Sequence, residues 1–284
     1  MNYILLLISI SSMVLHNSLL SRINKKHLHS KSDIYCYNSL LYIVCALLFA
    51  VMSFGGSISL YTVLLGFVFG LVTMLSTFYR SIALSKGPTH ITILIATSSM
   101  IIPTLSGTVL FGEKFSFPKL IAMVVLIFFI YLCSKNDEET KSIAKGWVLY
   151  CGLAFLSQGI IGVIQKIHQS SEHKSELFGF LLVSFCVSFV FARILTGNRK
   201  KERKFTKIHY IFALFSGVCM FTMNYLNLKL SGLLPSQLFF PAVNGSSLIL
   251  TTIVAVVLFK ETLTKRQVIG VVGGLLSLIA ICIL

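Results

Sequence analysis

The stretch TLSGTVLFGEKFS, residues 104–116, is matched in kind by TIVAVVLFKETLT, residues 252–264. Both begin with threonine, run through small and apolar residues to Val-Leu-Phe, skip one position and reach a glutamate. The two glutamates, Glu113 and Glu261, are 148 residues apart. At that offset further polar positions coincide, which chance matching of apolar sequence does not readily produce. The stretch therefore indicates an internal repeat.

The chain around this repeat is strongly apolar. Of its 284 residues 56% are hydrophobic and 12% charged, and the mean hydropathy is +0.88. Apolar runs of about 18 or more residues are typical of transmembrane helices. We predict ten spans, at about 2–21, 34–54, 59–85, 88–112, 118–134, 146–168, 177–195, 208–230, 235–260 and 267–284.

The predicted fold class is an all-α membrane protein of ten transmembrane helices, arranged as two inverted five-helix repeats around a central cavity. Residues 1–134 form the first repeat, 135–145 a polar linker, and 146–284 the inverted second repeat, within one integrated membrane domain. A five-span unit ends on the side opposite its start, so its copy enters upside down. Two such halves can expose one midplane site to each side in turn.

The basic residues predict the orientation. The net charge is +15, and 19 of the 24 Lys and Arg residues lie in the loops that follow the odd-numbered spans or at the span ends beside those loops. The positive-inside rule places these loops in the cytoplasm and both termini outside. We expect a multi-pass protein of the bacterial plasma membrane, with membrane lipids and a small-molecule substrate as partners and no nucleic acid.

The positions of the seven cysteines predict that they pack in the spans, and not that they bind a metal or form a disulfide. They lie in or at the ends of apolar spans, without a Cys-x-x-Cys pair or a Cys/His cluster. Free cysteine behaves as a small apolar residue. We expect no metal, no cofactor and no enzymatic activity.

Polar side chains deep in the spans are the candidates for a site, since each needs a partner or water there. Asn244 follows Pro241, which leaves a helix carbonyl unpaired, so we expect an unwound turn that lines the cavity, with Pro103 doing the same in the first half. The candidate substrate-binding residues are Asn17, Tyr79, Arg80, Ser98, Ser99, Gln158, Asn224, Asn227 and Asn244.

Each candidate also has a structural interpretation. Serines in a span often serve helix packing, and Arg80 is close enough to a helix end to extend to the interface. If Arg80 faces inward, it favours an anionic or zwitterionic solute. His16 is a possible carrier of a coupling proton, or a simply hydrogen-bonded histidine. Glu113 and its counterpart in the repeat, each close to lysines, are expected to pin the loop between the fourth and fifth helices of each half.

The chain resembles the drug/metabolite transporter superfamily, EamA type. The likeness is carried by ALSKGP (83–88), IIPTLSGTVLFGEKFS (101–116) and SQLFFPAVNGSSLILTTIVAVVLFKETLTKRQVIGVVGGLL (236–276). The resemblance implies ten helices in two inverted repeats and carrier-type transport of small organic solutes. The first helix departs from it by lacking a Trp-Gly signature, and the family's termini are usually described as cytoplasmic.

Three functions compete at this point. A secondary carrier, monomer or homodimer, that moves a small polar solute by alternating access agrees with the repeat. A lipid-modifying enzyme requires clustered His, Asp, Glu or Cys at an interface, and the charged loops show no such motif. A channel or scaffold subunit requires an oligomeric pore or a ring of like charges. The repeat favours the carrier.

Overall fold

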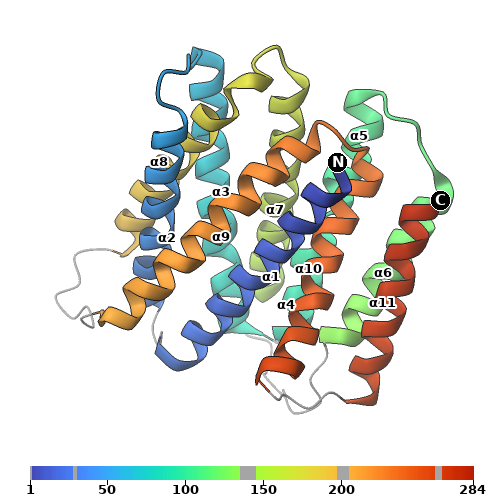
Figure 1. Cartoon of the computed structure of the whole chain (residues 1–284). Helices are drawn as coiled ribbons and strands as arrows, with labels where there is room; N and C mark the ends of the chain where they lie inside the picture. The colour runs from blue at the N-terminus through green and yellow to red at the C-terminus, as the bar shows by residue number, and fades with distance from the viewer. Residues whose placement is uncertain (1, 28–30, 88, 135–144, 197–204, 260–263) are drawn as a thin grey trace. The chain divides into compact units, whose positions relative to one another are not determined.

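The computed structural model describes residues 2–27, 31–87, 89–134, 145–196, 205–259 and 264–284, and in these the regular structure is entirely helical (Figure 1). The predicted linker, apart from Lys145, and Glu261 lie outside the described residues. The helices are α1 (Asn2–His27), α2 (Lys31–Met52), α3 (Leu60–Lys86), α4 (Thr89–Ser98), α5 (Ile101–Phe111), α6 (Phe117–Ser134), α7 (Trp147–Ser170), the 3-10 turn η1 (Lys174–Glu176), α8 (Leu177–Thr196), α9 (Lys207–Ser231), α10 (Ser236–Phe259) and α11 (Lys265–Ile283).

The helices have the lengths and composition that a bilayer requires. In the described part of the chain, nine spans are long and apolar enough to cross a membrane, and α4 and α5 together make one of them. The remaining apolar helix, α6, is slightly shorter. The prediction of an all-α, multi-pass membrane protein is confirmed.

The fourth predicted span is two helices and not one. α4 ends at Ser98 and α5 begins at Ile101. Pro103 has no backbone N–H, so the carbonyl of Ser99 instead accepts from the N–H of Ile102 at 3.0 Å. The restart puts the proline in the first turn of α5, where its missing N–H leaves no hydrogen bond unmade.

The corresponding span of the second half is a single helix. α10 continues through Pro241 as an unbroken helix, so the expectation of an unwound turn there is wrong. Pro241 lies only five residues after the start of α10, and a proline so close to a helix start unpairs few carbonyls.

The helix boundaries repeat at the offset found in the sequence. Shifted by 148 residues, α6 would cover residues 265–282, and α11 is Lys265–Ile283. The segment from α4 to α5, shifted in the same way, would cover 237–259, and α10 is Ser236–Phe259. α1, α2 and α3 correspond likewise to α7, α8 and α9.

The chain forms two compact units, and each draws on both halves of the sequence. Unit 1 is Tyr3–Met74 with Ile167–Lys229. In it α2 packs against its counterpart α8. The two helices are antiparallel, because Ser32 at the start of α2 donates to the carbonyl of Thr196 at the end of α8 at 3.3 Å. Phe49 stacks on Phe185 between them at 5.7 Å.

Unit 2 is Leu75–Lys166 with Leu230–Leu284. Here α6 packs against its counterpart α11, and α10 packs against α5, α6 and α11. Gly270, near the start of α11, lies against the backbone of Cys133, near the end of α6, so this pair is antiparallel too. Close approach is possible because glycine has no Cβ. In both units, helices related by the repeat offset are antiparallel neighbours.

Candidate functional site

A polar pair joins α3 to α7 within unit 2. Ser76 on α3 donates to Oε1 of Gln158 at 3.0 Å. Gln158 lies halfway along α7 and is half-buried. A buried amide needs such a partner, because an unpaired polar group in an apolar layer is costly. The amide nitrogen of Gln158 remains available as a donor to a solute.

Two more candidates lie close to this pair on α3. The ring of Tyr79 is 6.4 Å from that of Tyr150 on α7. Lys86, at the end of α3, places Nζ 4.6 Å from the centroid of the Tyr150 ring. Arg80 is exposed. The α3–α7 contact therefore combines an amide, a hydroxyl, two phenol rings and a lysine ammonium group.

Unit 1 contains a corresponding polar pair between α1 and α9. Ser9 on α1 donates to Oδ1 of Asn227 on α9 at 2.6 Å. Asn224, one turn earlier, donates to the carbonyl of Met220 at 2.8 Å. The ring of Tyr225 stacks on that of Phe178 at 5.2 Å. Of the predicted residues on α9, Asn227 is the one bonded to another helix.

The repeat offset relates these two pairs. α1 corresponds to α7 and α9 to α3, so both bonds join the same pair of equivalent helices. At the offset, Ser9 corresponds to Ser157, beside Gln158, and Asn224 corresponds to Ser76. Ser9 and Ser76 were absent from the predicted set. The polar match at the offset could have identified them.

The other candidates on α1 are close to the same helix contact. His16 is 6% exposed, and its Nδ1 lies 3.1 Å from the carbonyl and 2.9 Å from the hydroxyl of Ser216 on α9. Asn17 is half-buried. This histidine is thus hydrogen-bonded between helices, and its coupling role stays a prediction.

Three predicted residues donate from their side chains to backbone carbonyls three or four residues earlier in the chain. Asn244 donates from Nδ2 to the carbonyl of Phe240 at 2.9 Å. Ser98 donates to the carbonyl of Leu94 at 2.8 Å and Ser99 to that of Ala96 at 2.6 Å. Such back-bonding satisfies a hydroxyl or amide without a second helix.

Glu113, for which the sequence predicts a structural role, makes its contacts with distant parts of the chain. Gly112 ends α5 with a φ of 65°, and the N–H of Glu113 then donates to the carbonyl of Gly107. The carboxylate lies 2.5 Å from Nζ of Lys166 on α7, a residue distant in the sequence. It also accepts from the backbone N–H of Ser236 at 2.7 Å.

This ion pair stabilises three helix ends within unit 2. The carboxylate caps the N-terminus of α10, where the helix dipole favours negative charge. Lys166 donates to the carbonyl of Ser231, the last residue of α9, at 2.9 Å and to that of Leu234, just after the helix, at 3.4 Å. The C-terminal end of a helix favours positive charge. The side chains of Lys166 and Glu113 are 8% and 18% exposed. Sequence spacing gave no sign of this long-range pair.

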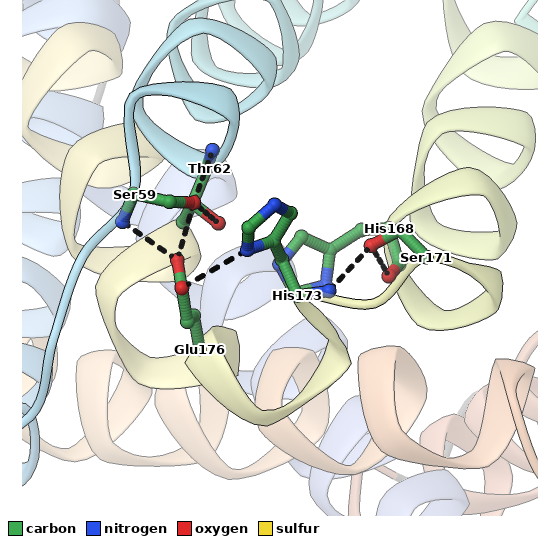
Figure 2. Close-up of polar contacts among 6 residues, drawn as sticks. All are labelled: Ser59, Thr62, His168, Ser171, His173 and Glu176. Carbon is green, nitrogen blue, oxygen red and sulfur yellow. Dashed lines mark hydrogen bonds and ion pairs between the residues drawn. The ribbon is translucent and has the colours of Figure 1, made fainter.

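A second carboxylate acts in the same way in unit 1. Figure 2 shows Glu176 of η1 accepting from the backbone N–H and the hydroxyl of Ser59, each at 2.8 Å, just before α3 begins. His173 lies 3.2 Å from the same carboxylate (Figure 2). Glu176 therefore caps α3.

The described residues contain no group of three or more His, Cys, Asp or Glu side chains that could hold a metal ion. All seven cysteines lie in the described segments as free thiols, and Cys45, Cys133 and Cys151 are buried. The chemistry open to the two polar pairs is to donate hydrogen bonds to a solute and to accept them from it.

Comparisons with known proteins agree with the architecture. Residues 145–283 match the model of the EamA-like transporter family. A solved structure described as "Crystal structure of protein" superposes with a TM-score of 0.75 at 13% identity, over 98% of this chain and 98% of that chain. At that identity the likeness shows the fold. No curated protein sequence matches the chain.

Proposed function

Because residues 145–283 belong to the EamA-like transporter family, part of the drug/metabolite transporter superfamily, we propose that the chain is a secondary carrier. It moves a small polar organic solute across the membrane by alternating access. The proposed binding residues lie in the interhelical polar pair of each unit taken by itself, Gln158 in unit 2 and Asn227 in unit 1. In the bacterial plasma membrane, such a carrier needs no cofactor.

The observation that supports this function best is the pairing of equivalent helices. α2 with α8, and α6 with α11, are antiparallel neighbours inside their units. An in-plane twofold axis turns a helix upside down, so helices close to that axis pack antiparallel against their own copies. The pairing therefore supports two inverted repeats, the architecture that provides two mirror-related conformations.

The polar pairs suggest how a solute is bound. A solute that enters an apolar layer loses its hydrogen bonds to water, and the protein must replace them. Gln158 and Asn227 each keep unused amide hydrogen-bonding capacity beyond their serine bond. Because equivalent helix pairs carry them, an exchange of conformations between the repeats would present comparable polar groups to either side.

The test is uptake by proteoliposomes. Purified protein is reconstituted and offered a panel of radiolabelled amino acids, organic acids, sugars, nucleosides and vitamins. We expect saturable uptake of at least one polar solute above that of protein-free liposomes. Gln158→Leu should reduce that uptake by at least about tenfold, since one amide–solute hydrogen bond is worth about 1.4 kcal/mol or more when its partner is left unpaired.

Gln169→Leu is the matched control. Gln169 belongs to the same helix but is next to its last residue, so its variant should transport normally. Uptake that equals protein-free liposomes for the whole panel, or that survives Gln158→Leu unchanged, contradicts the proposal.

A further inference from the structure

Arg80 is unusual among the residues around it. Of residues 75–84, all of which are described, Arg80 alone is exposed, and the others are buried or half-buried. It lies six residues before the end of α3, or about 9 Å at the helical rise. A guanidinium group cannot lose its charge in a protein, so it needs water or a counter-charge at this depth.

The described residues of unit 2 supply no free counter-charge. In the described parts of residues 75–166 and 230–284, Glu113 is the one acidic side chain, and it is occupied by Lys166 and Ser236. An exposed charge at this depth in an apolar layer is costly unless water or a counter-charge reaches it. A bound anion is the partner that this arrangement leaves open.

The surroundings of Arg80 are suited to the rest of such a solute. At 100° per residue, Ser76, Tyr79, Arg80 and Ala83 lie within about 100° of one another around α3. Ser76 and Tyr79 face the α7 residues Gln158 and Tyr150. Arg80 thus belongs to the same unit, and to the same arc of α3, as the two residues that contact α7.

We infer that Arg80 binds the oxyanion of the transported solute, and that the solute is an organic anion or zwitterion with a carboxylate or phosphate group. A guanidinium group matches these groups with two parallel hydrogen bonds. The substrate class rests on the proposed carrier function, but the binding of an oxyanion by Arg80 does not.

The alternative is that Arg80 extends to the headgroups. The end of α3 already has a basic side chain, since Lys86 reaches Tyr150 and donates to the carbonyl of Lys145 at 3.4 Å. An arginine that only extends to lipid would be protected from modification equally by a small anion and by a neutral molecule of the same shape. Comparing the two kinds of molecule is therefore a direct test.

The experiment measures modification of arginines by phenylglyoxal in the purified full-length protein, followed peptide by peptide with mass spectrometry. The probes are acetate, inorganic phosphate and the neutral acetamide, at matched ionic strength. Arg266, exposed at the start of α11, is the internal control. Acetate and phosphate are separate arms because a carboxylate and a phosphate are different sources of the same oxyanion chemistry.

We expect acetate or phosphate to slow modification of Arg80 about fivefold at about four times the dissociation constant of the anion. Acetamide should not slow it, and Arg266 should react at the same rate in every arm. Equal rates with anion and acetamide, or an Arg80 that does not react at all, would overturn the inference.

Arg80→Lys and Arg80→Gln extend the test to any transported solute. Transport should be lost in the glutamine variant and partly kept in the lysine variant, with thermal unfolding of both variants near that of the parent. Unchanged transport in Arg80→Gln refutes the inference and leaves the carrier intact. Conversely, anion protection of Arg80 without transport of any solute refutes the carrier and leaves the anion site.

Discussion

The ion pair between Lys166 and Glu113 predicts how a single substitution changes the stability of the protein. Glu113→Gln leaves the lysine charge unpaired while it is largely buried, and weakens the cap at Ser236. Breaking one partner of a buried pair costs about 3–5 kcal/mol. We expect a marked fall in unfolding temperature in detergent, followed through the fluorescence of Trp147, the one tryptophan of the chain.

Two further variants separate the ion pair from general damage. The double variant Glu113→Leu with Lys166→Met removes both charges and should regain more than half of the lost stability. Lys114→Met, at an exposed neighbouring position, should have little effect. An unfolding temperature that is the same for Glu113→Gln and Lys114→Met would show that the pair does not stabilise the protein.

Residue types were easier to predict from the sequence than their partners. The polar side chains of the spans are visible in the sequence, and Gln158 and Asn227 do join two helices. The partner of Glu113 was not predictable, because Lys166 is distant in the sequence and local lysines offered a simpler pairing. Local spacing carries no information about which helix ends meet.

At the scale of helices, the contact between α6 and α11 makes a second prediction. A side chain at Gly270 would overlap the backbone of Cys133, which cannot move aside as a flexible side chain can. Gly270→Ala should therefore force the helices apart and cost about 1–3 kcal/mol, the range for overpacking. The measurement is thermal unfolding of the detergent-solubilised protein.

Gly152→Ala is the matched control, since a Cβ there meets no atom within 4 Å. It should unfold at or above the temperature of the parent, because alanine is the better helix former. Equal destabilisation by both changes would mean that close approach of α6 and α11 is not what Gly270 provides.

Helix number and placement were predictable, but helix continuity was not. Hydropathy and the repeat determine where apolar segments begin and end to within a few residues. The two prolines look alike in the sequence, yet the chain breaks before Pro103 and continues through Pro241. The difference depends on how far each proline lies from a helix start, which the apolar pattern does not determine.

For the whole molecule, the orientation is the third prediction. With both termini outside, Lys114 lies in an external loop and Lys207 at the cytoplasmic end of α9, and both are exposed. In intact cells, a membrane-impermeant maleimide should label Lys114→Cys at once and Lys207→Cys only after permeabilisation. The background is a chain in which the native cysteines are replaced by serine or alanine. The reverse pattern would place both termini in the cytoplasm.

The inverted arrangement that we propose rests on counting, because a second copy of a five-span repeat would have to enter upside down. The composition of the compact units did not follow. Each unit combines helices of both halves, as α2 with α8 and α6 with α11 show. Which helices of one half pack against which helices of the other depends on the complementarity of their surfaces. Hydropathy carries no information about that complementarity.

The most direct test of a carrier is solute exchange across the membrane of proteoliposomes. Vesicles are loaded with an excess of unlabelled solute, chosen from those taken up in the panel, and diluted into a trace of the same solute in labelled form. A carrier that exposes one site to each side in turn should accumulate label transiently above its equilibrium level, and Gln158→Leu should abolish the overshoot. Label that rises only to equilibrium, whatever the internal load, would contradict alternating access.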